Sequence, residues 1–320
     1  MDKRFRTSLL AIAACALLGA FMVAEARASL KPIEGNVSPT RGKATFVYKT
    51  TPQGELKIDL YFPKGWKASD HRPAIVFFFG GGFRVGSPDQ FEPAAEYLAG
   101  RGMVAASADY RVRSRQKTGA DKSIEDAKSA VRWMRANARR LGIDPNRLAA
   151  GGGSAGATCA AFTAYNTTYE PRDEDADISE VPDALVLFNP AMGFPAHSSR
   201  YNTPAAKVMG VIISNWKVRK GGPPAIAFYG TEDELGIKGR AFVEQMIAAG
   251  NRAELFTAAG QKHGFFNHLR TAKDGTTKGV PGWYEATLYQ ADLFLESLGY
   301  LKGKPAITRM PGVRLKKELP

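Results

Sequence analysis

The stretch Leu148-Ala149-Ala150-Gly151-Gly152-Gly153-Ser154-Ala155-Gly156-Ala157 decides how this chain folds. Apolar residues run into three glycines, one serine follows, and small residues then continue as an expected helix. Gly152 to Gly156 fit the pattern G-x-S-x-G, which places a serine on a sharp turn between a buried strand and a helix. Only very small residues fit beside so crowded a turn. The stretch predicts an exposed Ser154 hydroxyl at the carboxyl end of a sheet, although an ordinary turn with an idle serine fits the same pattern.

The segments around this turn alternate between strands and helices. Pro73–Phe79 is continuously apolar, which is typical of a parallel strand buried on both faces. Ala44–Lys49 and Leu56–Phe62 are expected to form an antiparallel hairpin at one edge. The other expected strands are Met103–Ala108, Arg147–Ala150, Ala184–Phe188, Pro224–Tyr229 and Ala253–Thr257. The expected helices are Phe91–Arg101, Ser123–Leu141, the segment from Ser154 to about Tyr165, Lys238–Ala249 and Trp283–Leu298. This order predicts an α/β fold over residues 29–301, with one doubly wound, mostly parallel sheet and helices on both faces.

The length suits one large α/β domain or two small ones, and the composition indicates no nucleic-acid partner. The 320 residues carry a formal net charge of +13. The basic residues are spread along the chain and no nucleic-acid motif is present, so we expect no nucleic-acid binding. We also expect no metal and no cofactor. The sequence specifies no oligomeric state.

Residues 1–28 resemble an export signal. Basic residues come first, a short apolar run follows, and Ala26-Arg27-Ala28 is an A-x-A cleavage site that predicts Ser29 as the mature start. The alternatives are an uncleaved anchor or a lipoprotein attached at Cys15. The favoured interpretation is an exported protein, periplasmic or secreted, with no stable membrane span after cleavage.

Four further segments carry specific expectations. Residues 29–42 are expected to be a mobile lead-in. The acidic residues of 166–182 are interpreted as a solvated surface loop rather than a cation site. Residues 191–223 form a lid-like insertion with a helical stretch near Ala205–Ser214. Residues 302–320 are expected to be a loosely attached basic tail.

Chemically useful residues follow four of the predicted strands, at the sheet edge where working groups collect. A glycine loop follows Pro73–Phe79, Ser154 follows Arg147–Ala150, Asp233 follows Pro224–Tyr229, and His263 follows Ala253–Thr257. The order Ser, Asp, His is the one associated with this serine turn. Glu232 and Glu234 are alternatives for the acid and His268 is the alternative for the base. Cys159 is interpreted as a small buried hydrophobe.

Each of these residues has a chemical task. A serine hydroxyl becomes a good nucleophile when a base such as His263 takes its proton. Asp233 would hold the imidazole in the required tautomer and stabilise it once charged. The backbone N–H groups of Gly81, Gly82 and Ala155 would stabilise the negative oxygen of a tetrahedral intermediate.

On these residues the chain resembles the α/β-hydrolase fold esterases and lipases of the group related to hormone-sensitive lipase and bacterial acetyl esterases. The matching motifs are Gly80-Gly81-Gly82-Phe83, Asp109-Tyr110-Arg111, Asp144-Pro145-Asn146-Arg147, Gly152-Gly153-Ser154-Ala155-Gly156, Gly230-Thr231-Glu232-Asp233 and His263-Gly264-Phe265. The resemblance implies a carboxylic-ester hydrolase with Ser154 as nucleophile, Asp233 as acid and His263 as base. The chain departs from the family at Phe79, where the family has a histidine that braces the glycine loop. It also lacks a long N-terminal cap.

The leading hypothesis is therefore an exported serine carboxylesterase that acts on short-chain esters, with acetyl or feruloyl groups on polysaccharide as candidate substrates. A small-molecule ester is the other candidate. The alternatives are a serine peptidase on the same fold and a non-catalytic binding protein.

Overall fold

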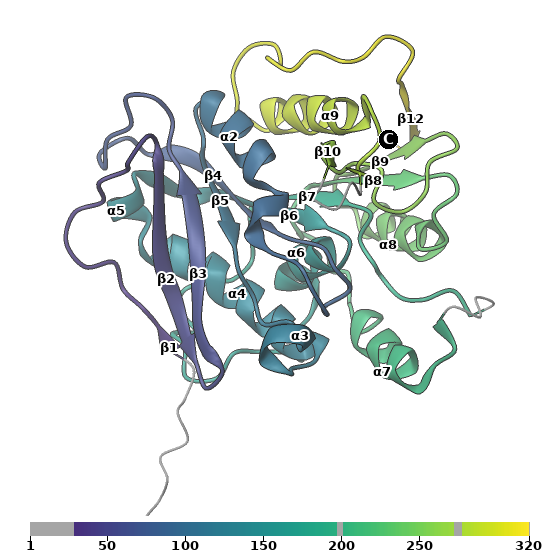
Figure 1. Cartoon of the computed structure of the whole chain (residues 1–320), viewed down its shortest axis with the longest axis horizontal. Helices are drawn as coiled ribbons and strands as arrows, with labels where there is room; N and C mark the ends of the chain where they lie inside the picture. Colours follow the sequence, from purple (N-terminus) through teal and green to yellow (C-terminus); the bar gives the residue numbers. More distant parts are fainter. Residues whose placement is uncertain (1–28, 197–200, 272–276, 320) are drawn as a thin grey trace, which may run out of the picture.

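The computed structural model describes residues 29–196, 201–271 and 277–319, and one large sheet runs through this part of the chain (Figure 1). Its strands lie in the order β1-β2-β3-β5-β4-β6-β7-β8-β9-β12. Their bounds are β1 Ser29–Leu30, β2 Lys43–Thr51, β3 Gly54–Tyr61, β4 Arg72–Phe78, β5 Val104–Ala108, β6 Ile143–Gly153, β7 Ala184–Phe188, β8 Ala225–Gly230, β9 Ala253–Ala258 and β12 Leu315–Leu319. The strands from β5 through β4 to β9 pair in parallel, and the pairs at both edges are antiparallel. The predicted doubly wound, mostly parallel sheet is confirmed.

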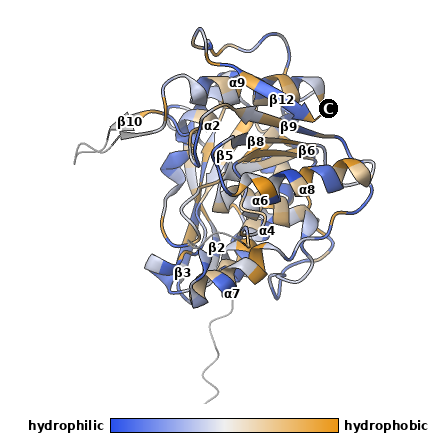
Figure 2. Ribbon diagram, turned by 90° about the vertical axis from the view of Figure 1, so that its right-hand side faces the viewer, coloured by the Kyte–Doolittle hydropathy of each residue, from blue (hydrophilic) through white to orange (hydrophobic). Residues whose placement is uncertain are grey.

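Helices cover both faces of this sheet, and strand β4 shows why its sequence is continuously apolar. Ala74, Val76 and Phe78 belong to a core beneath α4 Ala120–Ala136, α6 Ala155–Tyr165 and α8 Gly236–Ala248. Ile75 and Phe77 point the other way, into a core beneath α2 Glu92–Gly100 and α9 Trp283–Ser297. Because successive strand residues point to opposite faces, both sets must be apolar. Figure 2 shows the hydrophobic strands and α6 inside the molecule.

The remaining short elements lie at turns and in the insertion. They are η1 Pro88–Gln90, α3 Arg113–Gln116, α5 Ala138–Leu141, α7 Pro204–Ile213, β10 Arg270–Thr271 and β11 Thr277–Lys278. The expected helix Ser123–Leu141 is interrupted at Asn137. The side chain of Asn137 accepts a hydrogen bond from Ile33 N and donates one to Trp133 O, so it competes with the helix backbone.

Both ends of the described chain are more firmly attached than the sequence predicts. The expected loose tail is wrong for Leu315–Leu319, which pair antiparallel with β9 as strand β12. The expected mobile lead-in is wrong as well, because Ser29–Leu30 pair with β2 and Ile33 is buried in the core. In each case an open sheet edge accepts backbone hydrogen bonds that local sequence does not reveal. The predicted export signal lies outside the described residues.

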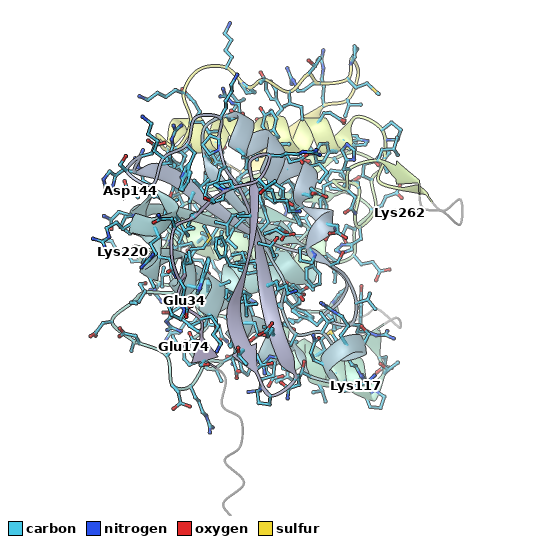
Figure 3. All side chains as sticks on the ribbon, turned by 60° about the vertical axis from the view of Figure 1, so that its left-hand side comes forward. Glu34, Lys117, Asp144, Glu174, Lys220 and Lys262 are labelled. Carbon is cyan, nitrogen blue, oxygen red and sulfur yellow. The ribbon has the colours of Figure 1, made fainter. Side chains whose placement is uncertain are left out.

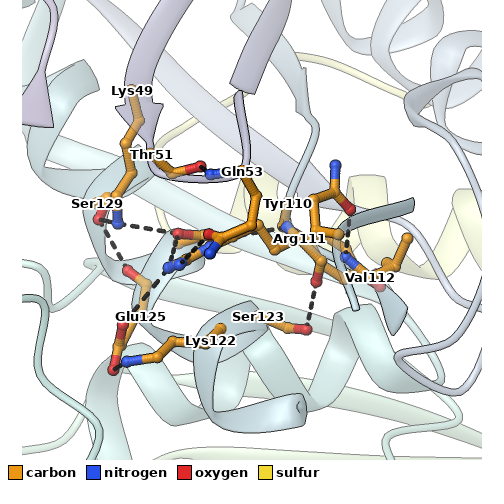
Figure 4. A network of polar contacts seen from close by, with 12 residues as sticks. Lys49, Thr51, Gln53, Tyr110, Arg111, Val112, Lys122, Ser123, Glu125 and Ser129 are labelled. Carbon is orange, nitrogen blue, oxygen red and sulfur yellow. Dashed lines mark hydrogen bonds and ion pairs between the residues drawn. The ribbon is translucent and has the colours of Figure 1, made fainter. Parts of the chain in front are cut away.

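A buried charged group, the Asp126 cluster, ties β2 to α4 and consists of Lys49, Arg111, Asp126, Ser129 and Glu174. Figure 4 shows Lys49, Arg111 and Ser129 pointing toward one another. Asp126 is fully buried, and its two oxygens lie 2.8 to 2.9 Å from Lys49 Nζ and Arg111 Nε. Lys49 Nζ also donates to Ser129 Oγ at 2.7 Å. Burial opposes ionisation of Asp126, but the charges of Lys49 and Arg111 outweigh it and lower its pKa.

The acidic segment 166–182 completes this cluster, so its interpretation as a solvated surface loop is right for the exposed Asp173, Asp175 and Asp177 and wrong for its glutamates. The side chain of Glu174 is only 2 % exposed and lies 3.6 Å from Lys49 Nζ. Glu180 pairs with Arg132 at 2.7 Å, and Glu170 pairs with the buried Lys128. The carboxylates neutralise cations that α4 and β2 bury, which local composition does not show.

Many other charged side chains lie on the outer surface. Exposed lysines such as Lys117, Lys220 and Lys262 point outward on separate parts of the molecule, in line with the dispersed basic residues of the sequence (Figure 3).

In the part of the chain that the structure describes, no helix has both the length and the apolar character needed to cross a membrane.

Candidate active site

Ser154 lies on the sharp turn between β6 and α6, as the sequence predicts. Its backbone has φ 53° and ψ −119°, a conformation that costs free energy for a residue with a side chain. A Cβ on Gly156 would lie 2.0 Å from Phe78 O, so only glycine fits where α6 begins against β4. The packing between strand and helix therefore holds Ser154 in its strained conformation.

Ser154, His263 and Asp233 form a continuous chain of hydrogen bonds. Ser154 Oγ lies 2.7 Å from His263 Nε2, and His263 Nδ1 lies 2.8 Å from Asp233 Oδ2. Side-chain exposure falls from 32 % at His263 to 2 % at Asp233, so the carboxylate is shielded while the imidazole faces the pocket. The structure brings together the three residues that the sequence places 109 and 30 positions apart.

Asp233 has two further partners, neither of which the sequence analysis singled out. Asn189 Nδ2 donates to Asp233 Oδ2 at 2.8 Å, and Leu235 N donates to Asp233 Oδ1 at 3.1 Å. Asn189 is fully buried, has φ 48° and follows β7, the neighbour of β8. Its position directly after a buried strand, at the sheet edge where Asp233 also lies, is the sequence signal that could have found it.

The alternative residues lie elsewhere. The carboxylate that contacts His263 belongs to Asp233, while Glu232 is exposed. His268 packs edge-on against Tyr284 with ring centroids 4.8 Å apart. Cys159 is fully buried in α6, and burial raises the pKa of its thiol. His197 lies outside the described residues.

The glycine loop after β4 lies opposite Ser154 and presents backbone N–H groups. Gly81 and Gly82 have φ angles of 131° and 63°, and both line the pocket together with Ala155. A Cβ on Gly81 would lie 2.0 Å from Val85 O, so the tight turn requires glycine there. Ala155 is the first residue of α6, where a helix leaves backbone N–H groups without intrahelical partners.

The loop is braced without the histidine that the family has at the position of Phe79. The Phe79 ring is fully buried and stacks on Tyr110 with centroids 4.1 Å apart, and Tyr110 donates its hydroxyl to Phe79 O. Gln90 accepts from Gly80 N and donates to Asn267 Oδ1, both at 2.5 Å. Asn267 in turn donates to Gly264 O, beside His263. Gln90 and Asn267 therefore link the glycine loop to the histidine loop.

A pocket of about 580 Å³ opens over Ser154. One side is the glycine loop, and the other is the insertion, which contributes Phe194, Tyr201 and Met209. The rings of Phe194 and Tyr201 stack with centroids 4.1 Å apart. Within the described ranges, no group of three or more histidine, cysteine, aspartate or glutamate side chains is arranged to hold a metal ion. The arrangement offers a nucleophile, a base with a shielded carboxylate, and backbone donors.

Comparisons with known proteins agree with this chemistry. The model of the BD-FAE family matches residues 58–185. Carboxylesterase NlhH of Mycobacterium tuberculosis is 27% identical over 260 residues, which cover 71% of this chain and 77% of that protein.

Solved structures show a stronger similarity. The apo form of Thermogutta terrifontis esterase 2 is 41% identical with a TM-score of 0.73, and the match covers 82% of this chain and 97% of that one. The propionate-bound form of the same esterase is 42% identical with a TM-score of 0.72, with the same coverage of both chains.

Proposed function

Because this chain belongs to the α/β-hydrolase esterase family and is a carboxylic-ester hydrolase, we propose that Ser154, His263 and Asp233 form its catalytic triad. The observation that carries the proposal is the hydrogen-bonded chain from Ser154 Oγ through His263 to the buried Asp233. Ser154 is the nucleophile, His263 the general base and then the general acid, and Asp233 the carboxylate that orients the imidazole.

The reaction proceeds through an acyl-enzyme. Ser154 Oγ attacks the carbonyl carbon of the ester while His263 Nε2 takes the hydroxyl proton, and the carbonyl electrons move onto the carbonyl oxygen. When this tetrahedral intermediate collapses, the bond to the alcohol oxygen breaks and that oxygen takes the proton from Nε2. A water molecule then attacks the acyl group by the same steps. The carboxylic acid leaves, and Ser154 regains its proton.

The oxyanion hole is assigned to the N–H groups of Gly81, Gly82 and Ala155. These glycines and Ala155 line the pocket beside Ser154, and no hydrogen bond from the Gly81 or Gly82 N–H is found within the described residues. Donors of this kind, fixed before the reaction begins, stabilise negative charge as it develops on the carbonyl oxygen.

The substrate is proposed to be a short-chain ester, with acetyl or feruloyl groups on polysaccharide as the candidate natural substrates. A pocket of about 580 Å³ bounded by Phe194 and Tyr201 suits a short acyl group on a bulkier alcohol. The propionate complex of the Thermogutta esterase is in keeping with a short acyl group. The pattern of residues 1–28, with the Ala26-Arg27-Ala28 cleavage site, supports export, as periplasmic or secreted protein.

The test is hydrolysis of a series of acetyl, butyryl, long-chain and feruloyl esters by the mature protein and its Ser154→Ala variant. Wild-type turnover should be highest for the short acyl groups, and the variant should lose nearly all of it. A fluorophosphonate probe should label the wild type and leave the variant unlabelled. Equal turnover by the two proteins would overturn the assignment of Ser154, and cleavage of peptides without ester turnover would favour a peptidase.

A further inference from the structure

A second cavity of about 230 Å³ adjoins the pocket over Ser154, which we call the reaction pocket. We call the second cavity the side cavity. Its walls include Arg84, Arg113, Thr118, Ala120, Val208 and Ile212. It shares Phe83, Arg84, Arg113, Ala205 and Met209 with the pocket over Ser154, so a substrate bound at Ser154 can extend into it. One wall belongs to the glycine loop, another to the start of α4, and a third to α7.

Two arginines stand side by side where the two cavities join. Arg113 N donates to Phe83 O at 3.0 Å and Ser114 N donates to Arg84 O at 2.9 Å, so the two segments run together. Both side chains are exposed, and neither has a side-chain hydrogen bond or ion pair with any part of the chain that the structure describes. The arginines on either side of Arg113 in the sequence do have ion pairs, because Arg111 pairs with Asp126 and Arg115 with Asp109.

The remaining walls of the side cavity carry no competing charge. Thr118 is among them, but its Oγ1 is buried and does not face the open space. The α7 wall is apolar, with Val208, Met209 and Ile212. No aspartate or glutamate lines either cavity in the described structure. Two exposed arginines with no acidic residue beside them suit a group that carries negative charge and accepts hydrogen bonds.

We propose that the side cavity binds a carboxylate carried by the ester substrate, held by Arg84 and Arg113. The planar guanidinium fork matches the two oxygens of a carboxylate, and the apolar α7 wall accommodates the carbon skeleton between it and the ester. This inference rests on the proposed function, because it concerns substrates that react at Ser154. The carboxylate can belong to the alcohol part, as in an acetylated acidic sugar, or to the acyl part, as in a monoester of a dicarboxylic acid.

Two matched pairs of esters distinguish these sources. For the alcohol part, hydrolysis of 4-acetoxybenzoate is compared with that of the neutral 4-acetoxybenzamide. For the acyl part, 4-nitrophenyl hemisuccinate is compared with 4-nitrophenyl butyrate. Each kcat/KM is divided by the rate of alkaline hydrolysis of the same ester, which removes differences in intrinsic reactivity. Wild type should prefer the charged member of at least one pair by about tenfold or more, because a hydrogen bond to a charged group is a strong one.

Variants then assign that preference to the side cavity. Arg84→Gln and Arg113→Gln should each lower the charged-to-neutral ratio about tenfold, and the double variant should lower it further. The matched control is Arg139→Gln, which removes an exposed arginine on α5 and should keep the wild-type ratio. High salt should reduce the wild-type preference, since it screens charges that solvent reaches.

The outcomes separate this inference from the proposed function. A wild type with equal normalised kcat/KM for both members of both pairs, or an unchanged ratio in the double variant, overturns the carboxylate site while Ser154-dependent turnover still supports the triad. Ester turnover that survives Ser154→Ala overturns the proposed function instead.

Discussion

Asp126 and Asp233 are both buried carboxylates, but different kinds of partner hold them. Asp126 lies between two full cations, Lys49 and Arg111, which lie 2.8 to 2.9 Å from its oxygens. Asp233 is held by neutral groups, the side-chain amide of Asn189 and the backbone N–H of Leu235, with the His263 ring as its third partner.

The difference shows how one molecule uses the same group for two purposes. Lys49 and Arg111 already balance the charge of Asp126. This carboxylate therefore holds β2 and Arg111 against α4 and has little electrostatic effect on other groups. The donors that hold Asp233 carry no charge of their own, so in the proposed mechanism the carboxylate can stabilise an imidazolium when His263 takes a proton. Exchanging or removing single groups in the two regions tests this distinction.

The largest expected effect is on catalysis, from Asp233→Asn. The amide cannot favour the required imidazole tautomer, so kcat should fall about 10⁴-fold while the free energy of unfolding changes by only about 1 kcal/mol. Steady-state kinetics and urea denaturation measure the two quantities. Glu232→Gln is the matched control, because it neutralises the exposed adjacent carboxylate and should keep kcat near wild type. If Glu232→Gln causes the loss and Asp233→Asn does not, the acid is misassigned.

The next effect is on stability, from Asp126→Asn. It leaves Lys49 and Arg111 buried without their shared counter-charge, so the free energy of unfolding should fall by about 3–5 kcal/mol. The kcat of the folded fraction should stay within a few-fold of wild type. Glu244→Gln, in an exposed ion pair with Arg240 on α8, should cost less than about 1 kcal/mol. A comparable cost for both variants would show that the Asp126 cluster is no more than a surface pair.

A smaller effect is expected from Asn189→Gly, which tests the neutral support of Asp233. Glycine accepts the φ of 48° at this position, so the change removes the side-chain donor without adding backbone strain. Loss of one hydrogen bond to a charged group should lower kcat about 10- to 100-fold, with a small change in KM. An unchanged kcat would show that Leu235 N and His263 suffice to hold Asp233.

The smallest effect is the dependence of the Asp126 cluster on pH. Because the pKa of Asp126 is lowered in the folded protein, its stabilisation is complete above the unfolded value of about 3.9 and disappears as the pH falls through the folded value. The difference in unfolding free energy between wild type and Asp126→Asn should be constant from about pH 5 to about pH 8 and shrink below about pH 4. Urea denaturation across this range measures it, and a difference that grows in acid would contradict the ion-pair explanation.

Much of the fold follows from local sequence patterns. Continuous apolar strands, glycine turns and an amphipathic α4 predict the elements and their alternation, because each depends on residues close together in the chain. The expected and observed bounds of β7 coincide at Ala184–Phe188. The edge strands β1 and β12 were missed, since their pairing depends on neighbours brought by the fold rather than on their own polar sequences.

The candidate site also has residues that the sequence predicted and residues that only the fold revealed. Ser154, Asp233 and His263 were found because residues at the carboxyl ends of parallel strands meet at one sheet edge, and motif order selects among them. Asn189, Gln90 and the two unpaired arginines were not found. Asn189 and Gln90 bind Asp233, Gly80 and Asn267, and local sequence patterns do not show which distant residues meet in the fold. The absence of a partner for the two arginines is likewise visible only in the folded chain.

The sequence by itself determined the alternating α/β plan, the serine turn and the residues that reach its edge, since these depend on side-chain size, periodicity and glycine at fixed spacing. Tertiary structure alone decided which charges are balanced. The acidic segment 166–182 neutralises buried cations, whereas Arg84 and Arg113 have no ion pair among the described residues and face the reaction pocket. The physical reason is that the free energy of a charged side chain depends on its burial and on partners far away in the chain. Only the folded molecule sets both.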